Sequence, residues 1–320
     1  MQNDSAVLRV KNLKKSYAGK RGITYEALRG VSFDIREGEI FGLLGPNGAG
    51  KSTTINILVG LLSEDSGSIE VFGKNFVEHH LWIRNQMNIA TAYAQLPIRL
   101  SVAENLRVFS YFYRVHEREK RINDLIELFG ITHLRNTQIG QLSAGQKTLV
   151  NICKSLLNEP RLLLLDEPTS SLDPENAAHV RTVLQKIQQE RPMTILWTSH
   201  DMPEIEEVCD RIAFLLNGKI EVVDTPDHLL QLVTTQQMTL VFSSIALAEA
   251  ASRIAWPKGI ACVKHEHRTV TLVVPHKEGA VRQVLRILHE KKIDFLDMHI
   301  IRPALEEVFL TMAERQKRTV

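Results

Sequence analysis

One short run near the start of the chain has residue types and spacing suited to binding phosphates. Its residues are Gly45, Pro46, Asn47, Gly48, Ala49, Gly50, Lys51, Ser52 and Thr53, the pattern G-x-x-x-x-G-K-S. Glycines let backbone N–H groups turn toward a chain of phosphates without a side-chain clash. We expect Lys51 to reach the β- and γ-phosphates and the Ser52 hydroxyl to hold Mg²⁺. The run is therefore interpreted as a phosphate-binding loop (P-loop).

The segments on either side of the P-loop favour this interpretation. Residues 39–44 form a short apolar run that predicts a buried strand, and residues 53–59 predict a helix. Such a helix would point its positive N-terminus at the phosphates. The alternative is a glycine-rich turn that carries lysine and serine by coincidence, and a strand before it with a helix after it disfavours that reading.

Two adjacent carboxylates form a second candidate for chemistry. Asp166 and Glu167 follow four consecutive leucines. The leucines predict a buried strand, and ligands of α/β proteins bind at the carboxyl ends of such strands. Successive strand residues point in opposite directions, so Asp166 can hold Mg²⁺ while Glu167 serves as the base that activates water. The alternative is a solvated acidic strand end.

Composition limits the class of protein. The chain has 320 residues, of which 44% are apolar and 24% are charged, and a net charge of +2. These values suit a soluble globular protein with length for two domains, and give no electrostatic argument for nucleic acid or an anionic membrane surface. No apolar run approaches the roughly 18 residues that span a bilayer, and the first residues lack the features of a secretory signal. Cys153, Cys209 and Cys262 are widely spaced and odd in number, as in reduced cytosolic proteins.

The order of predicted elements indicates two domains. Strands and helices alternate up to Val223, which predicts an α/β fold with a largely parallel sheet. Residues 77–136 are predicted to be mostly helical. From residue 232 the order becomes βαββαβ followed by a helix, which is typical of a small ferredoxin-like domain. We predict domains at 6–231, with a helical subdomain at about 77–160, and at 232–320, the latter a C-terminal α+β domain.

Three further motifs carry a family resemblance. Residues 142–146 read Leu-Ser-Ala-Gly-Gln, residues 170–173 read Ser-Ser-Leu-Asp, and His200 follows a predicted strand. Together with the P-loop and the carboxylates, they resemble the signature motif, D-loop and switch histidine of the nucleotide-binding subunit of an ABC transporter. The resemblance spans roughly residues 6–230. It departs from the family at Ala144, where glycine is commoner. It implies the P-loop NTPase fold of an ABC ATPase core.

The resemblance implies a site shared by two subunits. Two such domains meet head to tail, as a homodimer or with a similar ATPase. Each ATP, with Mg²⁺, lies between the P-loop of one subunit and the signature of the other. Glu167, His200 and Lys51 would be catalytic, and Ser52, Gln95 and Asp166 would contact the metal. The implied nucleotide contacts are Tyr17, Gly45, Asn47, Gly48, Ala49, Gly50, Lys51, Ser52, Thr53, Gln95, Ser143, Ala144, Gly145, Gln146 and Asp173.

Two of these assignments rest on weaker motifs. Gln95 resembles the Q-loop glutamine, which contacts Mg²⁺ and water and relays to the membrane subunit. Tyr17 resembles the aromatic residue that stacks on adenine. Tyr25 is a competitor for that role, and a tyrosine packed at a strand end is the plain structural alternative.

The C-terminal tail indicates a subgroup. Residues 301–310 resemble the "P-S-L-E-E-V-F-L" ending of the ATPase subunits of type 2 ABC exporters, which export drugs, lipids or polysaccharides, with Ala304 in place of the usual serine. The same residues also fit a plain amphipathic helix. We therefore expect the ATPase of an exporter, bound to a separate integral membrane permease at the cytoplasmic face of the membrane and without a nucleic-acid partner.

Two other functions stay open. The first is the ATPase of an importer, although importers with tails usually carry a longer β-barrel-like extension. The second is a non-transport ABC ATPase that acts on ribosomes or DNA. The single P-loop and the lack of a heptad run disfavour the second alternative.

Overall fold

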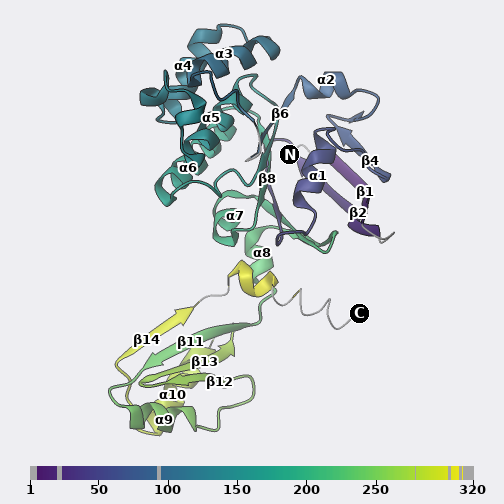
Figure 1. Cartoon of the computed structure of the whole chain (residues 1–320). Helices are drawn as coiled ribbons and strands as arrows, with labels where there is room; N and C mark the ends of the chain where they lie inside the picture. The colour runs from purple at the N-terminus through teal and green to yellow at the C-terminus, as the bar shows by residue number, and fades with distance from the viewer. Residues whose placement is uncertain are drawn as a thin grey trace. The chain divides into compact units, whose positions relative to one another are not determined.

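The structure is a computed structural model that describes residues 6–19, 24–91, 95–277, 279–301, 304–309 and 312. The chain divides into two compact units, Met1–Thr225 and Pro226–Val320 (Figure 1). The prediction put this boundary between residues 231 and 232. The difference is the short helix α8 (Pro226–Leu230), which the structure groups with the second unit. Each unit is described by itself below.

A six-stranded sheet forms the centre of the first unit. Its strand order is β10-β9-β3-β8-β7-β6. Five strands run parallel, and only β10 is antiparallel to its neighbour β9. All residues of β3, β7 and β8 are buried, as expected where a parallel sheet is covered on both faces. The predicted α/β fold is confirmed. The strands are β3 (Ile40–Leu44), β6 (Met87–Thr91), β7 (Leu162–Asp166), β8 (Thr194–Ser199), β9 (Arg211–Leu216) and β10 (Lys219–Asp224).

A second, antiparallel sheet packs against the helix that follows the P-loop. Its strand order is β2-β1-β4-β5. One apolar core contains Leu28 and Ile35 from this sheet, Ile55 from the helix α1 (Lys51–Leu58), and Leu43 from the parallel sheet. Helix α1 is therefore held between two sheets, which fixes the direction of its N-terminus. The strands are β1 (Ala6–Ala18), β2 (Thr24–Arg36), β4 (Ser66–Val71) and β5 (Lys74–Asn75).

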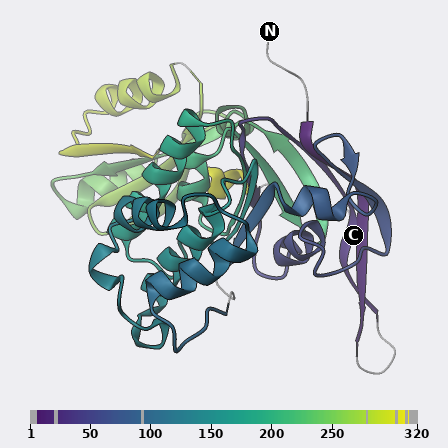
Figure 2. The ribbon, with the colours of Figure 1, turned by 90° about the horizontal axis from the view of Figure 1, so that it is seen from above.

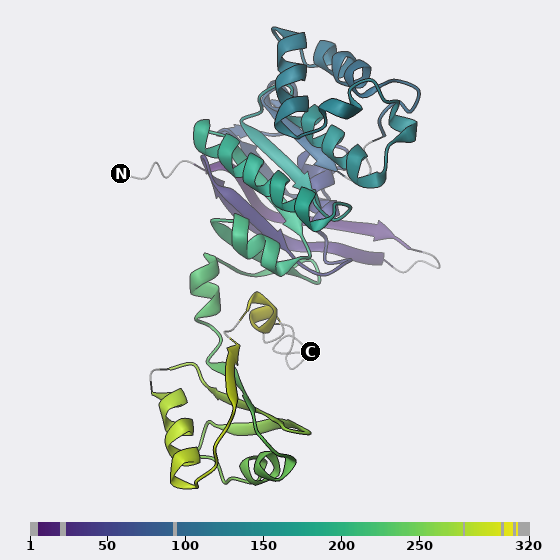
Figure 3. The same ribbon diagram turned by 90° about the vertical axis from the view of Figure 1, so that its left-hand side faces the viewer.

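Helices gather on the other side of this unit. Figure 2 shows the helices of residues 102–156 to one side of the parallel sheet and the purple strands to the other. The helices that contact one another there are α3 (Val102–Phe112), α4 (Arg118–Leu128) and α5 (Ala144–Leu156). Helices α6 (Pro174–Glu190) and α7 (Met202–Val208) lie over the parallel sheet (Figure 3), and α5 and α1 also contact its strands β6 and β7.

The helical region begins later than the predicted start at about residue 77. Only the short helix α2 (His80–Arg84) follows it directly, and the chain then forms β6, which pairs with β7 in the parallel sheet. The helical region begins at α3. The sequence of β6, Met-Asn-Ile-Ala-Thr, has only three apolar residues and a polar Asn88 within it, so its pattern does not stand out from the flanking segments.

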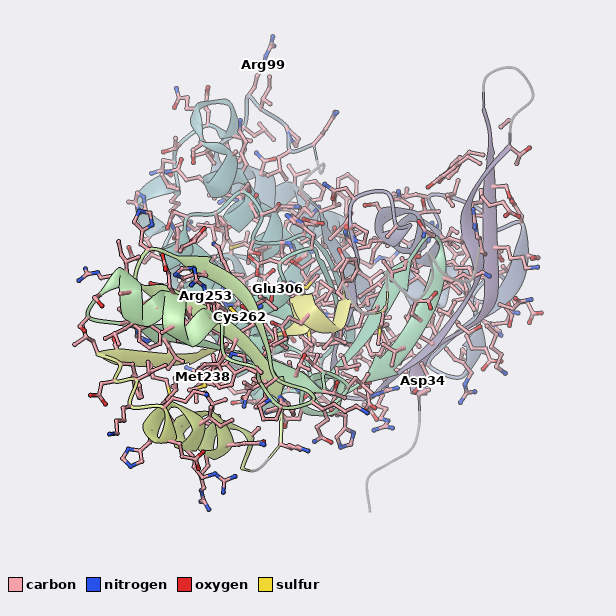
Figure 4. The ribbon with its side chains drawn as sticks, turned by 90° about the horizontal axis from the view of Figure 1, so that it is seen from below. Asp34, Arg99, Met238, Arg253, Cys262 and Glu306 are labelled. Atoms are coloured by element: carbon pink, nitrogen blue, oxygen red, sulfur yellow. The ribbon has the colours of Figure 1, made fainter. Side chains whose placement is uncertain are left out.

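The second unit contains the predicted βαββαβ order. Its four strands are antiparallel in the order β12-β13-β11-β14, and residues of both helices share one apolar core with β11 and β13. Met238 on β11 belongs to this core, and the partly buried Cys262 on β12 packs against it; both are labelled in Figure 4. Residues 305–309 are helical, residue 304 is not, and the rest of the predicted last helix lies outside the described residues except for residue 312. The elements are β11 (Thr235–Val241), α9 (Ile245–Ser252), β12 (Ala261–Glu266), β13 (Thr269–Pro275), α10 (Ala280–Glu290) and β14 (Asp297–Ile301).

A buried lysine lies inside the helical cluster. Lys154 on α5 is 8% exposed, and its Nζ lies 5.3 Å from the centroid of the Phe109 ring on α3. No ion pair is formed by Lys154 among the described residues. Burial lowers the pKa of Lys154 from its ordinary value of 10.5 to about 8, because the charged form loses its hydration. The cation–π contact with the Phe109 ring compensates for part of the lost hydration free energy.

We predict that Lys154→Met stabilises the protein by roughly 1–3 kcal/mol at pH 7, because the charged amine costs folding free energy when it is buried. Between pH 8 and 10.5 the unfolded chain binds more protons at this lysine than the folded chain, so wild-type stability should rise with pH over that window. The variant should lack this rise. Urea unfolding at several pH values measures both effects, with the exposed Lys186→Met as the matched control. Equal pH profiles for wild type and Lys154→Met would contradict the prediction.

Candidate active site

The P-loop connects β3 to α1 at the carboxyl edge of the parallel sheet. Two of its glycines need a left-handed backbone, with φ of 82° at Gly48 and 113° at Gly50. Gly45 has a different reason, because a Cβ there would lie 2.3 Å from the backbone oxygen of Leu215 on β9. The glycines are therefore required for two reasons: the conformation of the loop, and the close approach of the loop backbone to the sheet.

Lys51 is the first residue of α1 and is 5% exposed. Its Nζ donates a hydrogen bond of 2.6 Å to the backbone oxygen of Gly45 and lies 3.3 Å from Oε1 of Glu167. The ammonium group is thus inside the loop, where a bound phosphate would meet it.

The two carboxylates at the end of β7 have different surroundings. Asp166 is buried, and its Oδ1 accepts a hydrogen bond of 2.7 Å from Oγ1 of Thr198 on β8. Glu167 has a left-handed backbone with φ of 53°, and its N–H donates to the backbone oxygen of Thr198 at 3.1 Å. The turn directs the Glu167 side chain toward His200, whose Nδ1 lies 2.6 Å from Oε2 of Glu167. The carboxylate of Glu167 thus contacts both Lys51 and His200.

These groups line one cavity of about 400 Å³. It brings together residues from the antiparallel sheet, the P-loop and the ends of β7 and β8. The Tyr17 hydroxyl lies 3.3 Å from Oγ1 of Thr53, and the Tyr25 hydroxyl donates to the backbone oxygen of Gly48 at 3.1 Å. The lining residues are Tyr17, Tyr25, Ala27, Pro46, Asn47, Gly48, Gly50, Lys51, Ser52, Thr53, Asp166, Glu167 and His200.

The remaining predicted site residues lie elsewhere in the subunit. Ser143 caps the N-terminus of α5, where its Oγ accepts from the Gln146 N–H at 3.2 Å while Oε1 of Gln146 accepts from the Ser143 N–H at 3.0 Å. Gly145 packs against residue 171, and Asp173 caps α6. Neither these residues nor Ala144 line the P-loop cavity.

Gln95 also lies outside the P-loop cavity. It is exposed and lines a separate cavity of about 560 Å³, together with Leu96, Pro97, Ile98, Ile139 and Lys147. The described residues therefore do not place Gln95 beside Asp166 in this structure.

Sequence reasoning missed Thr198 and Ala27. Thr198 is fully buried and orients Asp166 through its hydroxyl. A threonine directly after the apolar run 195–197, and two residues before His200, was a usable signal, because a buried hydroxyl needs a partner. Ala27 lines the cavity by its position on β2, which no local pattern indicates.

The oxygen groups beside the P-loop fit a magnesium ion. Such ions are usually held by one or two carboxylates, a hydroxyl, phosphate oxygens and water. Ser52 and Asp166 supply a hydroxyl and a carboxylate to one cavity. Within the described residues there is no group of three or more His, Cys, Asp or Glu side chains able to hold a metal.

Comparisons with known proteins agree with this geometry. The sequence profile described as "ABC transporter" matches residues 28–170. The linearmycin resistance ATP-binding protein LnrL of Bacillus subtilis (strain 168) is 32% identical over 317 residues, which cover 98% of this chain and 100% of that protein. This chain belongs to the ABC transporter family as an ATP-binding subunit. It is an ATP hydrolase, and in general such subunits act as dimers with a membrane permease.

Two further relatives of the ABC subunit define the extent of the similarity. The methionine import ATP-binding protein MetN of Bordetella pertussis (strain Tohama I / ATCC BAA-589 / NCTC 13251) is 34% identical over 265 residues, which cover 76% of this chain and 70% of that protein. A dimeric, post-hydrolysis structure of the ATP-binding cassette MJ0796 bound to ADP and Pi is 27% identical, with a TM-score of 0.63. That match covers 68% of this chain and 98% of the other.

We predict that Tyr17→Ala weakens ATP binding about tenfold or more, because base–aromatic stacking is worth ~1–3 kcal/mol. Tyr17→Phe should bind ATP nearly as the wild type does, since it keeps the ring. Tyr25→Ala and Tyr25→Phe are the matched pair on the facing strand, where Tyr25 is paired with Tyr17. Fluorescence titration of all four variants measures the order of affinities. A larger loss for Tyr25→Ala than for Tyr17→Ala would assign the stacking role to Tyr25.

Proposed function

We propose that this ABC subunit powers an exporter, by hydrolysing ATP to drive a substrate through a separate integral membrane permease. The observation that carries the proposal is the similarity to LnrL along the whole of that protein, C-terminal unit included. MetN, named for import, is matched over only 70% of its length. The exporter-like tail at residues 301–310 supports the same choice. The importer alternative has less support.

The contacts of Glu167 support a role as the catalytic base. Its carboxylate is 3.3 Å from the Lys51 ammonium and 2.6 Å from His200 Nδ1. A γ-phosphate entering the P-loop offers Lys51 a stronger anionic partner than Glu167. Glu167 can then accept a proton from the attacking water. His200 keeps the Glu167 carboxylate and the γ-phosphate in position relative to each other.

Magnesium would be held by Ser52 and Asp166. Gln95 would become a further ligand if the Q-loop moved toward the P-loop. The ion would neutralise charge on the β- and γ-phosphate oxygens. Thr198 keeps the Asp166 carboxylate oriented toward that position through the 2.7 Å hydrogen bond. Phosphoryl transfer would therefore depend on positions set by β7 and β8.

The signature residues are proposed to act on the ATP of a second subunit. Ser143, Ala144, Gly145 and Gln146 begin α5 and do not line the P-loop cavity of their own chain. A helix N-terminus binds anions through its free N–H groups and dipole. A group supplied in this way by a partner can be worth ~10³–10⁵ in rate. We therefore propose a head-to-tail dimer, with Asp173 contributing beside the signature.

Four exposed apolar side chains, on α2, on α3 and in the loop before α3, are the proposed permease contact. Ile98 and Leu81 are 65% and 70% exposed, and Tyr111 and Phe112 at the end of α3 are 60% and 74% exposed. Exposed apolar side chains of this size can serve as contacts for a partner protein. None of the described helices has the length and apolar character needed to cross a bilayer. We propose peripheral attachment at the cytoplasmic face through the permease, without a nucleic-acid partner.

We predict that Glu167→Gln still binds ATP, loses at least ~100-fold in turnover because the base is gone, and accumulates as an ATP-bound dimer. Light scattering with and without ATP-Mg measures the dimer, and phosphate release measures turnover. Glu78→Gln, on the exposed surface, is the control. Near-normal hydrolysis by Glu167→Gln would remove this residue from the catalytic role.

We predict that the double variant Leu81→Asp with Phe112→Asp no longer co-purifies with the permease, while soluble ATP binding is unchanged. The reason is that two charges would be placed in an apolar contact. The measurement is affinity purification of the tagged subunit from solubilised membranes, with identification of the bound membrane protein. The matched control is Leu232→Asp with Ile245→Asp, both exposed in the second unit. Equal recovery of the permease with wild type and the first double variant would contradict the docking surface.

A further inference from the structure

A buried carboxylate close to the active site has no role in the mechanism above. Glu204 lies on α7 and is 5% exposed. Its two carboxylate oxygens accept hydrogen bonds from two hydroxyl groups of different loops. Oε1 accepts from Oγ1 of Thr169, and Oε2 accepts from Oγ of Ser199 at 2.8 Å.

The two hydroxyls belong to the loops that carry the catalytic groups. Thr169 is in the loop 168–173, which begins directly after Glu167 and ends at Asp173. Ser199 is the last residue of β8 and precedes His200. Glu204 therefore joins the loop after the proposed base to the residue before the switch histidine.

The side of the network near His200 is closed by backbone contacts. Oγ of Ser199 accepts from the Asp201 N–H at 3.0 Å, and the Asp201 carboxylate accepts from the Glu204 N–H at 3.0 Å. His200 lies between Ser199 and Asp201, so its backbone is held on both sides. A rotation of Ser199 would move the imidazole relative to Glu167.

The other side of the loop 168–173 is attached to the signature helix. Oγ1 of Thr148 on α5 lies 2.7 Å from Oγ of Ser171, and a Cβ on Gly145 would lie 3.0 Å from the Ser171 backbone oxygen. The loop is thus held between α5 and α7. Glu204 is the contact through which its α7 side is fixed.

We propose that Glu204 is a positioning residue for ATP hydrolysis, holding the loop after Glu167 and the loop of His200 as one hydrogen-bonded unit. This inference rests on the catalytic roles proposed for Glu167 and His200. Glu204 does not line the P-loop cavity. Its loss should therefore affect turnover and leave ATP binding in place.

A carboxylate suits the position of Glu204 better than an amide would. Burial raises the pKa of Glu204, and the hydrogen bonds from Thr169 and Ser199 oppose that rise. Asp201 also raises this pKa and Arg181 lowers it. A carboxylate can accept from both hydroxyls at once because it has acceptor sites on both oxygens. A glutamine accepts with one oxygen only, so one hydroxyl would have to reverse its direction.

The test compares steady-state ATP hydrolysis by wild type, Glu204→Ala, Glu204→Gln and Glu207→Ala. We expect kcat of Glu204→Ala to fall about tenfold or more, which corresponds to about 1.36 kcal/mol in the activation free energy. KM for ATP should change less than about twofold, because the nucleotide contacts remain. Glu204→Gln should recover part of that loss. Glu207→Ala is the control on the same helix, since Glu207 pairs with Arg181 at 3.0 Å and contacts neither loop.

A second pair of variants keeps the test decisive if Glu204→Ala does not fold. Thr169→Val and Ser199→Ala each remove one hydroxyl, and the double variant should lose less than the product of the single losses, because both act through Glu204. Thermal unfolding verifies that each variant is folded. A folded Glu204→Ala with wild-type kcat would overturn the proposal, as would an equal loss in Glu207→Ala. Absence of ATP hydrolysis by wild type would instead contradict the proposed function.

Discussion

The carboxylate of Glu167 is the contact on which the site depends. It is held between the Lys51 ammonium and the His200 imidazole, and these three residues follow three neighbouring strands of the parallel sheet, β3, β7 and β8. The strands are buried over their whole length, so each residue leaves the sheet at a fixed place. The large apolar core therefore sets the distances between a few polar atoms at its edge.

Local sequence patterns predicted this edge well because each pattern has its own physical cause. The glycines of the P-loop, the four leucines before Asp166 and the serine that caps α5 all act within a few residues of themselves. Contacts between distant segments were not accessible in the same way. Thr198 orients Asp166 across two strands, and β6 joins the sheet through pairing with β7 although its own residues are weakly apolar. Such features depend on tertiary pairing, which a local pattern does not record.

The distribution of site residues supports the proposed site shared by two subunits. The cavity contains the P-loop, the carboxylates, His200 and two tyrosines, whereas the signature residues begin a helix that faces elsewhere. The loop 168–173 connects these two regions, because it follows Glu167 directly and contacts α5 through Ser171. In the proposed dimer, a displacement of the signature helix by a partner's nucleotide would reach Glu167 over this short, hydrogen-bonded path.

The left-handed backbone at Glu167 limits how this position can change during evolution. Side chains branched at Cβ are strained at a φ of 53°, whereas glycine, asparagine and aspartate adopt it most readily. Each of these residues removes or shortens the carboxylate. None of the residues that this backbone accepts most readily keeps the full-length carboxylate proposed as the base, so the backbone conformation and the proposed chemistry place opposing demands on this position.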